Sequence, residues 1–212
     1  MRRVQVDPLA PQSDAIQEAA TWIRTGGVVA IPTDTLYGLA VNPFDAAAVA
    51  RLFAAKGRPD DRAVPLIAAD AAQVMTHISP LTATAARLAR RFWPGQLTLL
   101  LPAPAALARD VSAGTGRVGV RVPADHIACA VAAAVGTPVT ATSANRSGES
   151  ATSDPDVVER TLGTVVDFLL DTGRTPGGAP STIVDVTADP PTLVREGAIG
   201  WEEVQACLRH LG

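Results

Sequence analysis

Residues 26–40 read GGVVAIPTDTLYGLA, and this stretch determines the type of fold that the chain can adopt. The apolar run at residues 28–32 follows two glycines and is too short for a helix, so it predicts a buried strand. Two threonines, an aspartate and the chain's only tyrosine, Tyr37, follow it directly. In α/β proteins, binding residues gather in loops at strand ends. The stretch therefore predicts an α/β fold with a polar site after this strand.

Helices and strands alternate outward from this stretch. Several connections are too short for a crossover helix, so we expect a twisted, mixed β-sheet with helices packed on it, an α/β fold that some schemes class as α+β. Ser13 or Asp14 is expected to cap the first helix. Helices are predicted at residues 14–25, 45–55, 69–75, 81–92, 127–135, 157–162 and 201–211. Strands are predicted at 28–32, 64–68, 97–101, 118–122, 139–142 and 168–171, with a hairpin formed by 181–186 and 192–195.

Size and composition limit the classes of protein to which the chain can belong. Its 212 residues predict one domain, 1–212, with a core at about 12–200. A hydrophobic content of 47% argues against disorder, and a net charge of −3 argues against coating nucleic acid by bulk charge. The two cysteines, Cys129 and Cys207, match no metal-ligand spacing and are expected to be small buried apolar residues. We recognise no leader peptide and no membrane-spanning run, so we expect a cytoplasmic protein with no membrane contact.

Lys56 is the chain's only lysine, and Arg58 follows it at the predicted end of a helix. Two cations at this spacing can converge on one polyanion, the lysine as a point charge and the arginine as a fork. Helix C-termini also attract cations through the helix dipole alone. Both interpretations remain open from the residues themselves.

Residues 141–150 read ATSANRSGES, a run of small hydroxyl residues with a glycine. Such a run can present several donors to a phosphate, but a plain polar loop would look the same. Arg121 and Arg195 lie in otherwise apolar strands, where each needs a bound anion or a structural ion pair. The chain contains no HExxH, GxSxG or Walker pattern, which argues against metal-dependent and triad hydrolases and against a P-loop.

These clusters, in this order, resemble the family of L-threonylcarbamoyladenylate synthases of the YrdC/Sua5-like type, with a single YrdC-like domain. The resemblance extends from the first predicted helix to near the C-terminus. The matching pieces are GGVVAIPTDTLYGLA, AAKGRP, FWPGQLTLLL, VGVRVP, ATSAN followed by SG, PSTIVDVT and LVREGAI.

The resemblance implies a nucleotidyltransferase that joins L-threonine, bicarbonate and ATP to give threonylcarbamoyl-AMP and pyrophosphate. A downstream tRNA threonylcarbamoyl transferase would then modify an adenosine in tRNAs that read ANN codons. Mg²⁺ would be bound mainly through ATP, and no metal ligand is expected from the protein. Threonine would be held by Thr35, Arg121 and Ser181. ATP would be held by Lys56, Arg58, Ser143, Asn145, Ser150 and Arg195, of which Lys56 and Arg58 are the expected catalytic residues.

The chain departs from the family pattern at four positions. Val64 and Ala69 stand where the family usually has asparagine and histidine, Pro180 replaces a glutamate, and Thr142 replaces a proline. Arg62 is a candidate replacement cation. These departures leave open how strictly the site would select threonine.

Two other functions are alternatives. One is carbamoyl-adenylate formation, as in hydrogenase-maturation relatives, which surround this domain with an acylphosphatase and Cys-rich modules. The other is a non-catalytic RNA-binding or ribosome-assembly module. The low pI of 5.6 and the 4% aromatic content argue against the second, although weak RNA binding is retained as an expectation.

Overall fold

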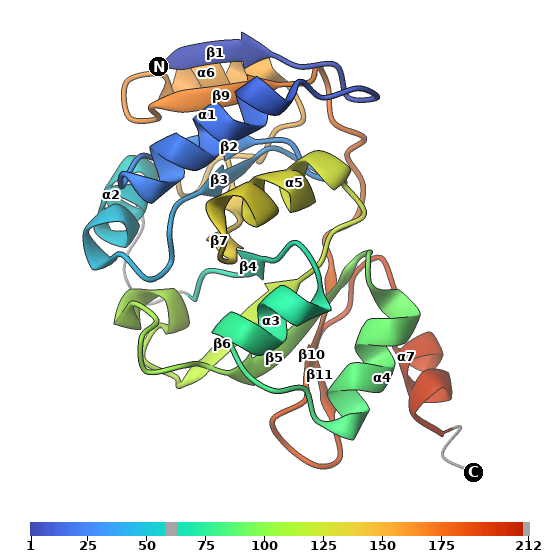
Figure 1. The fold of residues 1–212 in the computed structure, drawn as a ribbon. Helices are drawn as coiled ribbons and strands as arrows, with labels where there is room; N and C mark the ends of the chain where they lie inside the picture. Colours follow the sequence, from blue (N-terminus) through green and yellow to red (C-terminus); the bar gives the residue numbers. More distant parts are fainter. Residues whose placement is uncertain (58–62, 210–212) are drawn as a thin grey trace.

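The computed structural model describes residues 1–57 and 63–209, which form two mixed β-sheets with helices packed on them. Figure 1 shows one sheet in the upper half of the molecule and the other in the lower half. The α/β class with mixed pairing is confirmed, but the strands divide between two sheets where a single sheet was expected. The upper sheet has the order β1 (Arg2–Gln5), β9 (Phe168–Asp171), β2 (Val29–Ile31), β3 (Gly38–Ala40), β8 (Thr142–Ser143). The lower sheet has the order β11 (Thr192–Arg195), β10 (Thr182–Asp185), β5 (Leu97–Pro102), β6 (Arg117–Arg121), β4 (Leu66–Ile67), β7 (Val139–Thr140).

The chain crosses from the lower sheet to the upper one at Ala141. Strand β7 pairs with β4, whereas β8, which begins one residue later, pairs with β3. The prediction of a single strand at 139–142 was therefore wrong. The buried Thr140 hydroxyl holds the crossing in place, because it accepts a hydrogen bond from Val41 N at 2.9 Å and donates one to Leu39 O at 3.2 Å.

The upper sheet is covered on both faces. Val29 and Ile31 of β2 belong to the apolar cluster beneath α1 (Ser13–Arg24) and α5 (His126–Val135). Ala30, which points the opposite way, belongs to a second cluster that includes residues of α2 (Ala46–Lys56) and α6 (Pro155–Leu162). Burying an Ile side chain fully contributes roughly 1.5–3 kcal/mol. Because both faces of β2 are buried, its sequence is a continuous apolar run, as is typical of such strands.

The lower sheet has one apolar face and one partly polar face. Leu97, Leu99 and Leu101 of β5 point into the second cluster. Thr98 and Leu100 alternate with them and line a cleft on the opposite face. Helices α3 (Ala71–His77), α4 (Ala83–Phe92) and α7 (Trp201–Arg209) contribute residues to that second cluster. This alternation gives the cleft a floor of both polar and apolar side chains.

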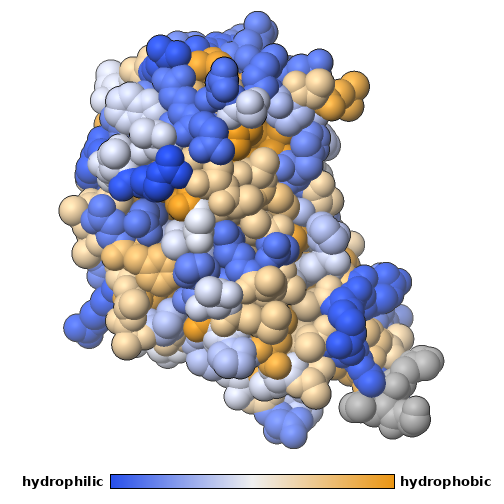
Figure 2. All heavy atoms as spheres, viewed as in Figure 1, coloured by the Kyte–Doolittle hydropathy of each residue, from blue (hydrophilic) through white to orange (hydrophobic). Residues whose placement is uncertain are grey.

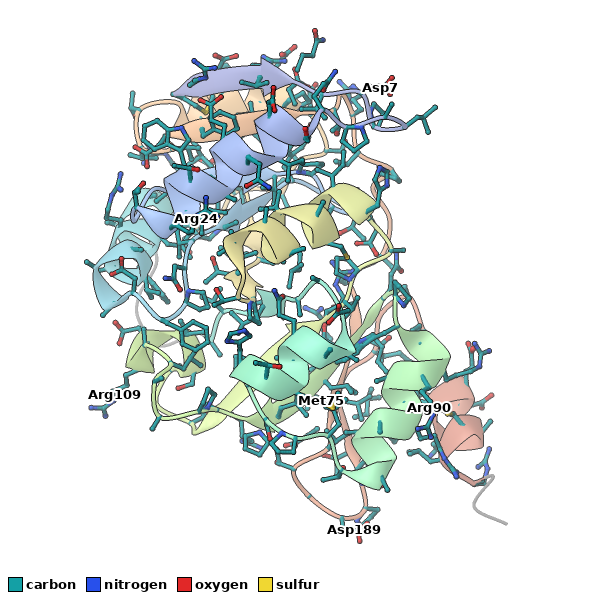
Figure 3. All side chains as sticks on the ribbon, in the orientation of Figure 1. Asp7, Arg24, Met75, Arg90, Arg109 and Asp189 are labelled. Atoms are coloured by element: carbon teal, nitrogen blue, oxygen red, sulfur yellow. The ribbon has the colours of Figure 1, made fainter. Side chains whose placement is uncertain are left out.

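The predicted helices are confirmed with small shifts in their bounds, except that residues 210–211 of the last predicted helix lie outside the described residues. The predicted hairpin is confirmed as the antiparallel pair β10 and β11. Figure 3 shows Asp189 at the tip of the loop that joins these two strands. The N-cap of α1 is Gln12, without a side-chain capping bond, so the prediction of Ser13 or Asp14 was wrong. Strands β1 and β3 were not predicted.

Surface apolar residues are scattered among polar ones. Figure 2 shows apolar and polar atoms interspersed on the face that carries α3 and α5. The large apolar side chains that are exposed, Leu9, Met75 and Val194, come from separate segments, and Figure 3 shows Met75 on α3. Across residues 1–57 and 63–209, every helix falls short of the length and apolar content that a bilayer crossing requires.

Candidate active site

A cleft of about 500 Å³ lies between the two sheets, where the loop after β2 meets the partly polar face of the lower sheet. Both sheets contribute to its wall. The upper sheet and its loops supply Thr33, Thr35, Leu36, Tyr37, Gly38, Ala141, Thr142, Ser143, Ala151 and Gly178. The lower sheet and its loops supply Ala63, Val64, Pro65, Leu66, Ile67, Thr98, Leu100, Gly119, Arg121, Pro180, Ser181, Ile183 and Arg195.

Two threonine hydroxyls face each other on the upper wall. Thr33 Oγ1 lies 3.1 Å from Thr35 Oγ1 and donates to Leu36 O at 2.7 Å. Thr35 N donates back to Thr33 Oγ1 at 3.2 Å, so the turn after β2 is closed by its own side chain, as threonine turns are. Gly177 N donates to Thr35 O at 2.7 Å and ties the 172–178 segment to this turn. The Thr35 hydroxyl is thereby held at the cleft wall.

Arg121 projects into the cleft from the last position of β6 and pairs with Asp34. Its Nη1 lies 2.9 Å from Asp34 Oδ1 and donates to Asp34 Oδ2 at 3.1 Å. Each side chain is 11% exposed, so water screens the pair little. Arg121 thus already has a structural counter-ion, which was one of the two alternatives that the sequence left open. A guanidinium has five N–H donors, so further donors are available to a bound carboxylate.

Arg195 reaches the same cleft from the end of β11 and contacts Ser181. Its Nη2 donates to Ser181 O at 2.7 Å and contacts Ser181 Oγ at 3.4 Å, and Thr98 Oγ1 lies 2.8 Å from the same Oγ. Partial burial and the positive charge of Arg121 lower the pKa of Arg195. Two guanidinium groups that repel each other in this way favour an anion between or beside them.

Lys56 ends α2 and is 4% exposed, beneath the loop that follows β8. Its Nζ donates to the main-chain carbonyls of Ser143 and Asn145, the latter at 2.9 Å. Ser147 N donates back to Lys56 O at 2.8 Å. The buried ammonium therefore shapes the loop at residues 143–147, which presents Ser143 to the cleft.

The other residues predicted to bind ATP do not line the cleft where the structure describes them. Asn145 closes the same loop by donating to Arg146 O at 2.9 Å and Glu149 O at 2.7 Å. Ser150 is exposed and does not line the cleft, although its neighbour Ala151 does. Arg58 and the candidate replacement cation Arg62 lie outside the described residues.

The structure therefore brings together Thr35, Arg121, Ser143, Ser181 and Arg195, which all line one cleft. Of the four departures from the family pattern, Val64, Thr142 and Pro180 line it and Ala69 does not. Sequence reasoning missed Thr98 as a cleft residue. The signal was present, because Thr98 is the one polar residue in the strand LTLLL and alternates with core leucines.

Other reactive groups in the described chain are poorly suited to catalysis. Cys129 is half-buried rather than buried, and burial together with nearby carboxylates raises the pKa of its thiol to about 11. Burial likewise raises the pKa of Tyr37, whose hydroxyl donates to Gly173 O at 2.7 Å. Cys207 is half-buried as well. No three His, Cys, Asp or Glu side chains converge anywhere in residues 1–57 and 63–209 in a way that could hold a metal ion.

Comparison with known proteins identifies relatives over most of the chain. The family model described as "Telomere recombination" (Sua5, YciO, YrdC) matches residues 21–197. The threonylcarbamoyl-AMP synthase of Pyrococcus abyssi is 41% identical over 92% of this chain and 58% of its own length. The enzyme of the same name from Halorhodospira halophila is 38% identical over 87% of this chain and 91% of its own length.

A solved structure also shares the fold. The crystal structure of Pyrococcus abyssi Sua5 complexed with L-threonine superposes with a TM-score of 0.92 at 35% identity, over 99% of this chain and 61% of that one. The chain thus spans about 60% of the length of the Pyrococcus proteins that it matches.

Proposed function

Because this chain belongs to the Sua5/YciO/YrdC family, we propose that it is a threonylcarbamoyl-AMP synthase. It would join L-threonine, bicarbonate and ATP to give threonylcarbamoyl-AMP and pyrophosphate. One observation carries this proposal. A single cleft holds two guanidinium groups, Arg121 and Arg195, beside the hydroxyls of Thr35, Ser143 and Ser181. Such a cleft suits an amino acid with a hydroxyl side chain and a carboxylate next to a polyphosphate.

The proposed roles follow the walls of the cleft. Arg121 binds the threonine carboxylate with the N–H groups that Asp34 leaves available, because a planar fork matches a carboxylate. Thr35 and Ser181 offer hydroxyls to the rest of the amino acid. Ser143 and Arg195 face ATP from opposite walls. Lys56, Arg58, Asn145 and Ser150 complete the ATP site in this proposal.

The chemistry requires positioning and charge stabilisation more than a reactive side chain. The threonine amine and bicarbonate first form a carbamate with release of water, and one carbamate oxygen then attacks the α-phosphorus of ATP. The bond from the α-phosphorus to the bridging oxygen breaks, and pyrophosphate leaves with the electron pair. Negative charge accumulates on the phosphoryl oxygens, so fixed guanidinium groups lower the barrier by stabilising it.

Mg²⁺ would enter with ATP. The cleft wall offers hydroxyls and guanidinium groups, which fit the phosphates, and Mg²⁺ takes its oxygen ligands from such phosphates and from water. When bound it would neutralise phosphate charge and favour pyrophosphate as a leaving group.

In the cell, the product would pass to a tRNA threonylcarbamoyl transferase, and the cytoplasm is the proposed compartment. Weak binding to RNA would accompany that transfer. A non-catalytic RNA-binding module is the less favoured function, since the relatives named above carry the name of an enzyme.

Omitting one substrate at a time tests the proposal. The purified chain is incubated with ATP, Mg²⁺, bicarbonate and L-threonine, and pyrophosphate is measured. We expect pyrophosphate only in the complete mixture. Pyrophosphate formed without threonine would show a different reaction. RNA binding that weakens with salt, in a chain that forms no pyrophosphate, would favour the binding-module alternative.

A further inference from the structure

Thr98 is a buried hydroxyl at the floor of the cleft. It is 2% exposed, and its neighbours along β5, Leu97 and Leu99, point into the core. A hydroxyl this deeply buried is normally hydrogen-bonded. The hydrogen bond that the structure gives Thr98 Oγ1 joins it to Ser181 Oγ at 2.8 Å. The pairing of β10 with β5 places Ile183 opposite Thr98, and Ser181 precedes Ile183 by two residues, so the alternation of a strand brings Ser181 to the same face as Thr98.

Ser181 Oγ lies between a neutral hydroxyl and a cation. Arg195 Nη2 approaches it at 3.4 Å, and a guanidinium only donates hydrogen bonds. If Ser181 donated its proton to Thr98, the buried Thr98 proton would lack an acceptor. If Thr98 donates to Ser181, both Thr98 and Arg195 are satisfied. The Ser181 proton then points to neither of them and is available to a ligand in the cleft.

We propose that Thr98 is a positioning residue, which donates its proton to Ser181 Oγ and so turns the Ser181 hydroxyl into a donor toward an oxygen of the amino-acid substrate. This inference rests on the proposed function and deepens it. Thr98 would act on threonine binding through Ser181. It would have little effect on ATP, since Arg195 is held mainly by the Ser181 main-chain carbonyl at 2.7 Å, which is not part of the Thr98 contact.

A substitution at Gly119 offers a second, independent way to disturb Thr98. It lies opposite Leu100 on β6, and a Cβ built there would come within 3.0 Å of Thr98 Cγ2 and 3.4 Å of Leu100 Cδ2. Gly119 lies within a strand, so alanine can adopt its backbone conformation. Gly119→Ala would therefore press on the methyl group of Thr98. Thr98→Ser removes that methyl group and keeps the hydroxyl.

The test compares KM for L-threonine, KM for ATP and kcat in the full chain and its variants. Thr98→Val keeps the shape and removes the hydroxyl, and we expect KM for threonine to rise about tenfold, the equivalent of ~1.4 kcal/mol. KM for ATP should change by no more than about twofold, which corresponds to less free energy than the loss of one hydrogen bond. Thr98→Ser should restore the KM for threonine. Thr192→Val, the same substitution on exposed β11, should leave all three constants unchanged.

A double-mutant cycle tests the same contact in a second way. Gly119→Ala alone should raise KM for threonine, and it should do so much less in the Thr98→Ser background, where the pressed methyl group is absent. An unchanged threonine KM in Thr98→Val would overturn the inference. So would equal rises in both KM values that Thr98→Ser fails to reverse, since that pattern indicates general damage to the cleft.

Calorimetric titration with L-threonine separates this inference from the proposed function. An unaltered chain that binds threonine, together with a Thr98→Val variant that binds it equally well, overturns only the role of Thr98. An unaltered chain that neither binds threonine nor releases pyrophosphate overturns the synthase proposal and the inference with it. Weaker threonine binding by Thr98→Val, with recovery in Thr98→Ser, supports the inference even if turnover is slow.

Discussion

Asp34 and Arg121 form an ion pair that joins the two sheets at the cleft. Asp34 belongs to the loop between β2 and β3 of the upper sheet, and Arg121 ends β6 of the lower one. Their 2.9 Å contact is reinforced by Ala124 N, which approaches Asp34 Oδ2 at 3.4 Å. The residue proposed to bind the substrate carboxylate is thus fixed by a residue from the opposite wall.

Removing the carboxylate should destabilise the protein. Asp34→Asn would leave a guanidinium that is 11% exposed without its counter-ion, and losing one partner of a buried pair costs roughly 3 kcal/mol. For a chain of this size, that corresponds to a fall in Tm of about 6–12 °C. Thermal unfolding measures it, with Asp189→Asn at the exposed hairpin tip as control. Equal Tm values for the two variants would show that the pair contributes no net stability.

Arg121→Lys should weaken threonine use even though it keeps the positive charge. A lysine ammonium cannot present the paired donors of a guanidinium to a carboxylate. We expect KM for threonine to rise about tenfold or more, a loss of at least ~1.4 kcal/mol of binding. Steady-state kinetics with ATP saturating provide the measurement. Arg109→Lys, an exposed position away from the cleft, is the control. An unchanged KM for threonine would show that a residue other than Arg121 binds the substrate carboxylate.

Lys56→Met should affect both stability and ATP use. The substitution keeps the buried stem and removes the ammonium, so the carbonyls of Ser143 and Asn145 lose a charged donor, at a cost of about 1.5–3 kcal/mol. The loop that presents Ser143 should shift, and KM for ATP should rise more than KM for threonine. Arg24→Met is a matched control, because Arg24 also donates to a main-chain carbonyl, Ala134 O at 2.6 Å, but at an exposed site. If both variants behaved alike, the burial of Lys56 would be without consequence.

Asp185 should make stability depend on pH in the acid range. Burial alone would raise the pKa of this carboxyl, but hydrogen bonds from Thr187 and the Arg117 ion pair outweigh burial and lower it. A group with a lowered pKa in the folded state stabilises the fold above its unfolded pKa, about 4, and this contribution is lost as the pH falls through the folded pKa. Urea unfolding near pH 7 and about pH 3 should therefore show a smaller acid-induced loss for Asp185→Asn than for the parent chain. Equal acid-induced losses of stability in the variant and the parent chain would show that other carboxyl groups cause the acid sensitivity.

Local sequence patterns were sufficient to predict much of the fold. The strand at 28–32, the helix at 81–92 and the hairpin across Asp189 were all predicted, because period and turn residues specify such elements locally. Strand β1 was missed because its pairing with β9 joins residues far apart in the sequence, Arg2 with Phe168. Strand β3 was missed because it is only three residues long, begins with Gly38 and forms by pairing with β2 and β8.

The site was also predicted only in part, because local sequence patterns do not show which distant residues come together. Arg121 and Arg195 were identifiable as charges within apolar strands, but the partner of Arg121 comes from another sheet, and no spacing rule connects it with Asp34. To predict that Thr98 lines the cleft, one must know which face of β5 the cleft occupies. That face is set by the packing of Leu97 and Leu99 into the core and by the pairing with β10.

Identification of the product tests the proposed synthase activity of this chain. The chain is incubated with ATP, Mg²⁺, L-threonine and ¹³C-bicarbonate, and the nucleotides are analysed by mass spectrometry. We expect threonylcarbamoyl-AMP carrying one ¹³C atom, formed in step with pyrophosphate and lost with Arg121→Lys at low threonine. AMP or ADP without a labelled threonylcarbamoyl group would contradict the proposed activity.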